Sequence, residues 1–220
     1  MNSSNLTTNV KPDFTSKALS PTMCVTPWGI YDVANPQEKD IKWDMIAQSL
    51  SRQTRFNGLN GDIGGYSIAQ HCVLGADALM EEQGDTYLAA HFLLHDAHET
   101  FIGDITRPVE NYFGANFSEK ANIIKTKWDE KIYSVASLVP PSAFNRNDLV
   151  KEMDNRMLAY EFHCFFPNLV KQIPEMTNMV PPKIKDVFKP WGPATSEIAF
   201  LDRLEKYLGI NVKFQSGNSH

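Results

Sequence analysis

One helical stripe in the sequence changes from apolar to ionisable along its length. Leu88, Phe92, His95 and Glu99 are spaced four, three and four residues apart, which places them on one face of a predicted helix over residues 86–102. The apolar start of the stripe directs this face toward the protein interior. We therefore expect the imidazole and the carboxylate to lie inside the protein, where such groups bind metal ions or transfer protons.

Two other predicted helices also carry a polar side chain in a core-facing row. His71 takes the place of an apolar residue in the helix over residues 66–83. Asp154 has an apolar residue four positions before it and another four positions after it. A carboxylate buried there without a partner would cost on the order of several kcal/mol, so it requires a cation or strong hydrogen-bond donors.

Together, the polar groups on these three helices form the donor set of one mononuclear divalent metal site: His71, His95, Asp96 and Asp154. Nitrogen and oxygen donors admit cobalt, manganese, zinc, iron or nickel, which this donor set does not distinguish, and they argue against a thiolate site. The alternative is three separate core groups, each satisfied by its own hydrogen bonds, which is the commoner situation for any one of them alone. The joint pattern on three helices favours the metal.

The elements that must position these residues are mainly helical. Further helices are predicted over residues 41–54, 116–138, 147–165 and 195–208, with a minor β-ribbon over residues 24–33 and a glycine-rich loop over 57–65. Asn116 and Glu119 resemble a capping box, and Pro108 argues against an early helix after Gly103. The predicted class is all-α, with a mobile N-terminal arm (1–22) followed by a single domain (23–220).

Composition excludes several classes of protein. The chain has 220 residues, 42% hydrophobic and 21% charged, with a net charge of −5 and no block of Lys or Arg. The length and composition predict one globular domain. The acidic net charge and the lack of a basic block argue against a protein that binds along a nucleic-acid polymer. The chain contains no apolar run of the roughly 18 residues that a membrane span needs, and no secretory signal. Three widely spaced cysteines favour a reducing, cytoplasmic location.

The order His71, His95-Asp96, Asp154 resembles the H…HD…D signature of HD-domain metal phosphohydrolases. Residues 51–58, 66–71, 93–109 and 150–161 are similar to YfbR-like 5′-deoxynucleotidases and to related phage dATP triphosphohydrolases, and the resemblance extends over roughly residues 28–208. It implies an HD-domain helical bundle around one divalent metal, a homo-oligomer, and a deoxynucleotide substrate. The location would be a host cytoplasm if the chain is phage-encoded.

The resemblance also implies a role for individual residues. The metal ligands would be His71, His95, Asp96 and Asp154, and Glu99 would be the catalytic acid/base. Arg55 would orient the phosphate, and Phe56 would pack on the nucleoside. A substrate-contacting turn would comprise Asp104, Ile105, Thr106 and Arg107, and Lys151 matches a lysine that contacts phosphates in the triphosphatase relatives. Without the resemblance, Arg55 is a helix-end cation, Phe56 a core residue and Lys151 a solvated lysine.

Two departures bear on the substrate. Glu110 stands where the family often has lysine, which would repel a polyphosphate, and Phe56 replaces a commoner tryptophan. The implied reaction is attack of a metal-activated water on the phosphorus of a deoxynucleoside monophosphate, with release of phosphate. One alternative is a dNTP triphosphohydrolase preferring dATP, with Mg²⁺ accompanying the triphosphate. The other is a catalytically silent HD domain that senses nucleotides.

Overall fold

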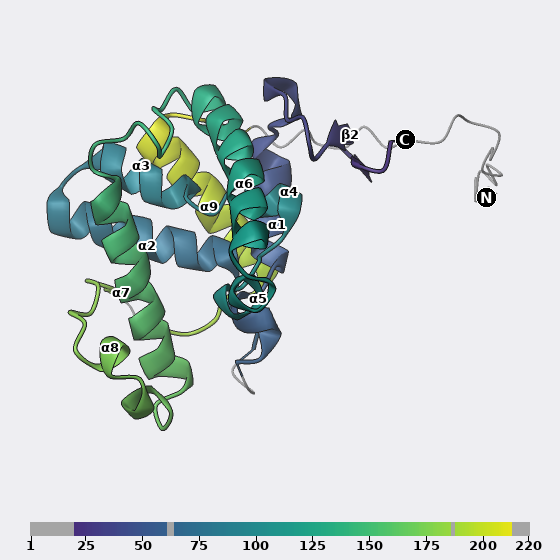
Figure 1. Cartoon of the computed structure of the whole chain (residues 1–220). Coiled ribbons are helices and arrows are strands. Elements are labelled where there is room, and N and C mark those ends of the chain that lie inside the picture. The colour runs from purple at the N-terminus through teal and green to yellow at the C-terminus, as the bar shows by residue number, and fades with distance from the viewer. Residues whose placement is uncertain (1–19, 61–63, 186–187, 213–220) are drawn as a thin grey trace, which may run out of the picture.

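The fold is mainly helical with a small N-terminal hairpin, as predicted (Figure 1). The computed structural model describes residues 20–60, 64–185 and 188–212, so most of the predicted arm and part of the glycine-rich loop lie outside the described residues. The helices are α1 (Trp43–Arg52), α2 (Ile68–Gln83), α3 (Thr86–Leu94), α4 (Glu99–Ile102), α5 (Arg107–Phe113), α6 (Ala115–Val135), α7 (Asn147–Phe165), α8 (Pro174–Thr177) and α9 (Pro193–Leu208), with short 3₁₀ turns at η1 (Glu38–Asp40), η2 (Arg55–Gly58) and η4 (Val170–Gln172). Within the described ranges, no helix combines the length and apolar character that crossing a bilayer requires.

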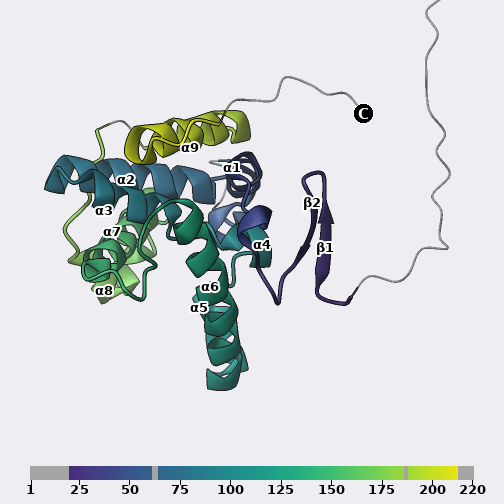
Figure 2. The same cartoon turned by 90° about the horizontal axis from the view of Figure 1, so that it is seen from above.

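The predicted ribbon is an antiparallel hairpin. Strand β1 (Met23–Thr26) pairs with β2 (Gly29–Asp32), and the hairpin stands beside α1 and α4 (Figure 2). Tyr31 of β2 attaches it to the helical body, because its ring meets those of Phe101 and Trp128 edge-on at centroid distances of 5.4 and 5.6 Å.

The centre of the molecule is the antiparallel pair α2 and α3. Helix α9 packs on one side of this pair and α7 contacts both helices from the other side (Figure 2). Hydrogen-bonded caps fix where both central helices begin, since the Ser67 side chain accepts from Gln70 N and that of Asp85 accepts from Tyr87 N and Leu88 N. The polar stripes of α2, α3 and α7 therefore face a common interior region.

A close contact between the central helices sets their separation. A Cβ atom added at Gly75 of α2 would lie 2.1 Å from the ring of Phe92 on α3. The same ring packs 4.4 Å from the His95 imidazole and 5.6 Å from the His71 imidazole, measured between centroids. The absence of a side chain at Gly75 thus controls how closely the two histidines approach.

We expect Gly75→Ala to destabilise the protein by about 1–3 kcal/mol, because the added methyl group must displace a buried ring. Urea denaturation measures this change. Gly192→Ala is the matched control: its Cβ would meet no atom within 4 Å and its φ of −67° is ordinary for alanine. If the two substitutions cost the same, Gly75 does not set the α2–α3 separation.

Three local predictions are wrong. The helix expected over 86–102 ends at Leu94, and the chain turns through residues 95–98 before α4 begins. Helix α5 includes Pro108, which lies in the first turn, where the missing N–H costs no hydrogen bond. Helix α6 begins at Ala115 with Gly114 as its N-cap, so Asn116 and Glu119 form no capping box.

Candidate metal centre

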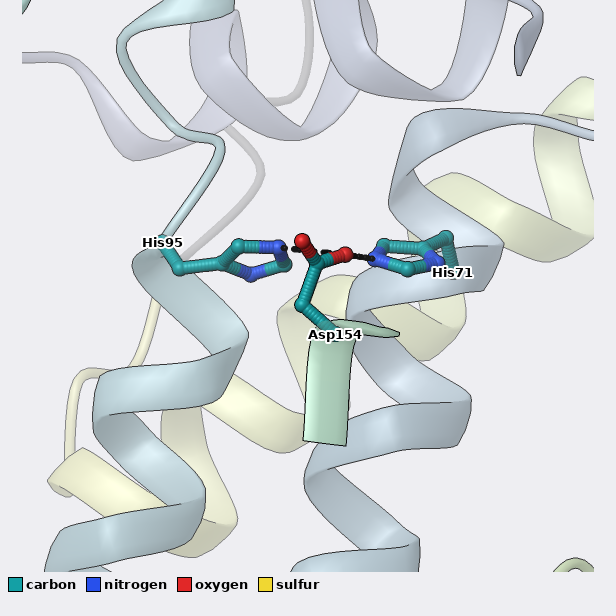
Figure 3. A group of neighbouring side chains, drawn as sticks. All are labelled: His71, His95 and Asp154. Carbon is teal, nitrogen blue, oxygen red and sulfur yellow. Dashed lines mark ion pairs between the residues drawn. The ribbon is translucent and has the colours of Figure 1, made fainter. Parts of the chain in front are cut away.

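Three side chains from three helices meet between α2, α3 and α7. His71 lies on α2, His95 caps the C-terminus of α3, and Asp154 extends from α7 between the two imidazoles (Figure 3). Asp154 Oδ1 lies 3.2 Å from His71 Nε2 and 3.7 Å from His95 Nε2. The three potential ligand atoms all lie within 4.8 Å of one another, a spacing that one bound ion can bridge.

The break after α3 brings Asp96 to the same place. Backbone hydrogen bonds to the third residue before the donor come from His95, Ala97, Glu99, Thr100 and Phe101, for example from Glu99 N to Asp96 O at 3.0 Å. The chain here is therefore tighter than an α-helix. As a result, Asp96 turns back toward its neighbour, and its Oδ2 lies 3.2 Å from His95 Nε2 and 4.0 Å from His71 Nε2. The structure thus brings together all four predicted ligand residues.

Hydrogen bonds fix both imidazoles with Nε2 free. His71 Nδ1 lies 2.6 Å from Glu161 Oε1, and His95 Nδ1 lies 2.6 Å from the carbonyl oxygen of Phe92. Because a carboxylate and a carbonyl only accept, each Nδ1 must carry the proton. Both Nε2 atoms are buried and lack a hydrogen-bond partner among the described residues, despite their short distances to carboxylate oxygens. This is the arrangement of metal-binding histidines, whose second nitrogen donates to an orienting group.

The charges of the cluster leave room for a cation. Burial opposes charge on His95, yet the Asp96 and Asp154 carboxylates raise its pKa well above the usual value. Burial likewise opposes ionisation of Asp154, but the two neighbouring imidazoles hold its pKa well below the usual value. Positive charge on the His95 ring thus offsets part of the negative charge of the two carboxylates. A divalent cation would take over this role, so the residues fit such an ion in both donor type and charge.

Glu99 lies at the edge of the cluster, at the start of α4. One oxygen each from Asp96 and Glu99 and one ring nitrogen of His98 lie within 4.8 Å of one another. Burial raises the pKa of the Glu99 carboxyl well above its usual value, and the Asp96 and Asp104 carboxylates raise it further. Its Oε2 is buried without a partner among the described residues. Glu99 therefore suits a proton donor more than a proton acceptor.

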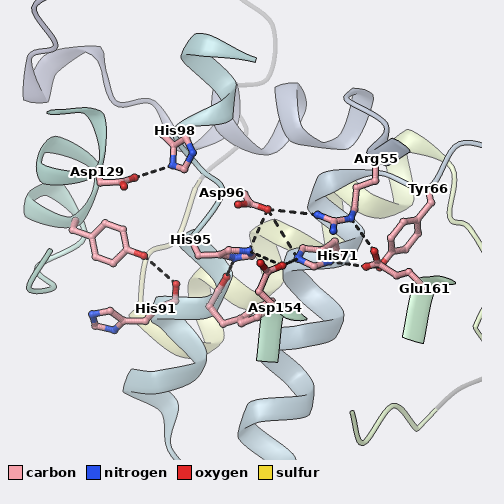
Figure 4. A network of polar contacts seen from close by, with 12 residues as sticks. Arg55, Tyr66, His71, His91, His95, Asp96, His98, Asp129, Asp154 and Glu161 are labelled. Carbon is pink, nitrogen blue, oxygen red and sulfur yellow. Dashed lines mark hydrogen bonds and ion pairs between the residues drawn. The ribbon is translucent and has the colours of Figure 1, made fainter. Parts of the chain in front are cut away.

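Arg55 is held beside the cluster by a short backbone pairing. Arg55 N donates to Tyr66 O at 2.9 Å and Ile68 N donates to Gln53 O at 3.0 Å, which fixes residues 53–55 against the start of α2. Arg55 Nη1 lies 3.7 Å from Asp96 Oδ2 (Figure 4). Burial opposes the charge of Arg55, but Glu161 and Asp96 raise its pKa, so the guanidinium stays charged next to the candidate metal position.

Phe56 lies in an aromatic cluster. Its ring meets those of Phe162, Phe165 and Phe166 at centroid distances of 5.5–6.0 Å. Phe56 and Asn57 both have left-handed backbone geometry, with φ of 56° and 52°. Strain of this kind costs about 1–3 kcal/mol per residue and persists mainly at functional sites. Phe56 is only half-buried in this cluster, so part of its ring remains accessible beside Arg55.

The remaining predicted substrate contacts are spread around the cluster. Asp104, Ile105 and Thr106 are half-buried in the segment that joins α4 to α5. Burial raises the pKa of Asp104, and its charge interacts with those of Arg55 and Asp96. Arg107 is exposed and its Nη2 lies 3.4 Å from the side-chain oxygen of Asn155, the residue after Asp154. Lys151 is exposed on α7, one turn before Asp154.

Three neighbours of the cluster were not predicted as site residues. Glu161 and Tyr66 are fully buried beside His71, and Cys72 has its sulfur within 4.8 Å of potential ligand atoms of His95 and Asp96. Burial raises the pKa of the Cys72 thiol to about 11, so it remains protonated and is a poor ligand. Glu161 follows Asp154 by seven residues on one helix face, and this spacing was the available signal.

Comparisons with known proteins give a distant relationship. No protein-family model matches the chain. An uncharacterized protein of Rhodobacter capsulatus is 32% identical over 91 residues, which cover 40% of this chain and 46% of that protein. The match therefore spans less than half the length of the relative, and the relative's name states no activity.

Proposed function

We propose that this protein is a divalent-metal-dependent phosphohydrolase of the HD-domain type that removes phosphate from deoxynucleoside monophosphates. The observation that carries the proposal is the convergence of two free Nε2 atoms and two carboxylates on one point, with a guanidinium and a buried carboxyl beside it. The similarity of the sequence to 5′-deoxynucleotidases supplies the substrate class.

The chain's own residues divide the work of phosphate ester hydrolysis. His71, His95, Asp96 and Asp154 would hold the cation, which when bound lowers the pKa of water and polarises a phosphoryl oxygen. Arg55 offers a planar fork to the remaining phosphate oxygens. As the water oxygen bonds to phosphorus and the bond to the ribose oxygen breaks, Glu99 donates its proton to that leaving oxygen. One proton of the attacking water stays on the released phosphate and the other passes to solvent, from which Glu99 regains a proton.

A triphosphate substrate is the second candidate, and cations at the rim favour it. Arg107 reaches α7 next to Asp154, and Lys151 lies one turn before Asp154, so a longer phosphate chain would find two exposed cations. Glu110, expected to repel a polyphosphate, lies 3.2 Å from Lys125 Nζ, and this lysine offsets its charge. In that case hydrolysis at the same phosphorus would release triphosphate.

Product analysis separates the candidates. The full chain, loaded with Co²⁺, Mn²⁺ or Zn²⁺, is incubated with the four deoxynucleoside monophosphates and the four triphosphates, and ³¹P NMR identifies the products. We expect orthophosphate from a monophosphate. Triphosphate from dATP would support the second candidate, and nucleotide binding without turnover under every metal would favour a sensor and contradict both enzymatic proposals.

A further inference from the structure

One buried carboxylate connects the candidate metal centre to the candidate phosphate site. Glu161 of α7 is fully buried, and its two oxygens receive three hydrogen bonds (Figure 4). Oε1 accepts from His71 Nδ1 at 2.6 Å and from Tyr66 Oη at 3.0 Å, while Oε2 accepts from Arg55 Nε at 3.0 Å. A single side chain thus contacts a predicted metal ligand and the predicted phosphate-binding cation.

The contact with His71 has a chemical consequence. An acceptor at Nδ1 keeps the proton on that nitrogen, so the lone pair of Nε2 stays directed at Asp154 and His95. The negative charge of the carboxylate also makes Nε2 of the imidazole a stronger electron-pair donor to a metal ion. Partners of this kind typically change metal affinity by about 10–100-fold when they are removed.

The contact with Arg55 has a geometric consequence. Glu161 engages Nε, which leaves Nη1 directed to the other side of the guanidinium, 3.7 Å from Asp96. The backbone pairing fixes the position of the Arg55 backbone. The long side chain needs a second contact to fix the orientation of the guanidinium plane. Glu161 supplies that anchor inside the protein, where water cannot compete for it.

We propose that Glu161 is a positioning residue that fixes the His71 imidazole for the metal and the Arg55 guanidinium for the phosphate at the same time. This inference rests on the proposed function for its phosphate part, whereas its metal part stands on the geometry of His71 alone. The Tyr66 hydroxyl donates to the same carboxylate, and among the described residues it makes no hydrogen bond to the His71 imidazole or the Arg55 guanidinium. Removing this hydroxyl therefore serves as the control.

The test uses the full chain and two probes, Co²⁺ and inorganic phosphate. We expect Glu161→Gln to weaken Co²⁺ binding by about 10–100-fold in competition with a chromophoric chelator, because the neutral amide cannot hold the Nδ1 proton as the carboxylate does. Tyr66→Phe should stay within about twofold of the parent. A Glu161→Gln protein that melts at a lower temperature but binds Co²⁺ as the parent does would overturn the proposal, because Glu161 would then be structural only.

The phosphate arm is measured at saturating Co²⁺. Glu161→Gln and Arg55→Ala should each weaken phosphate binding, and the double variant should match Arg55→Ala alone, because the carboxylate acts through the guanidinium. Additive losses would contradict this part. If the parent binds Co²⁺ but neither binds nor releases phosphate, the proposed function fails while the metal arm still tests Glu161.

A measurement on the unaltered protein covers the case in which Glu161→Gln does not fold. Long-range ¹H–¹⁵N correlation spectra of the Zn²⁺-loaded chain report which ring nitrogen of His71 carries the proton. We expect the Nδ1-protonated form with a slowly exchanging proton, since Glu161 and His71 are both fully buried. A His71 ring protonated at Nε2 would overturn the proposal.

Discussion

Asp154→Ala should abolish both metal binding and turnover. The Asp154 carboxylate is the one group on α7 that reaches both imidazoles, with Oδ1 3.2 and 3.7 Å from their Nε2 atoms. Removing this carboxylate takes away a predicted ligand. The loss of metal affinity should therefore be larger than the loss of about 10–100-fold that is typical when an orienting partner is removed. Equilibrium dialysis against Zn²⁺ followed by metal analysis measures bound ion, and the nucleotide assay measures turnover.

Glu152→Ala is the matched control for this substitution. Glu152 is exposed on the same helix, two residues from Asp154, and its loss removes the same charge from α7. It should leave zinc content and turnover unchanged. If Asp154→Ala retains one equivalent of zinc, Asp154 is not a ligand and the four-residue centre is wrong.

Glu99→Gln should keep the metal and lose turnover by about 10²–10⁴-fold, the usual contribution of a positioned acid or base. Glutamine preserves the size of a side chain whose Oε2 is buried, so the fold should be little affected. Zinc analysis and the nucleotide assay on the same preparation separate the two effects. Activity equal to that of the parent would show that Glu99 is not the proton donor.

The pH profile gives an independent signature of Glu99. Burial, Asp96 and Asp104 raise its pKa well above the usual value, so the carboxyl keeps its proton to higher pH than a free glutamic acid does. A general acid must be protonated, and the rate should therefore fall as the pH rises through this raised pKa. The residual activity of Glu99→Gln should not decline over that pH range. If the same decline remains in this variant, another group causes it.

Much of the helical frame could be predicted because the apolar period and the end signals agree. Helix α7 spans the predicted residues, and α2 begins two residues late because Ser67 serves as its cap. The break at His95 could not be predicted, since a 3.6-residue and a 3.0-residue period differ little over one turn. Helix α5 departs from the prediction because proline breaks a helix interior but is tolerated in the first turn, where Pro108 lies.

The candidate centre could be predicted where a polar residue replaces an apolar one. His71 and Asp154 stand in core-facing rows, and the structure brings them to one point. The pairing of Arg55 with Glu161 could not be predicted from the sequence, because the two residues are 106 positions apart. They meet through the backbone pairing at the start of α2 and the packing of α7. The strained backbone of Phe56 likewise leaves no trace in the sequence.

Anomalous diffraction from a crystal grown with Zn²⁺ tests the central claim most directly. Data collected on both sides of the zinc absorption edge locate the ion without reference to the proposed chemistry. We expect one strong peak bounded by His71 Nε2, His95 Nε2 and the carboxylates of Asp96 and Asp154. No zinc at that point, with both Nε2 atoms instead bonded to water or to protein acceptors, would contradict the account.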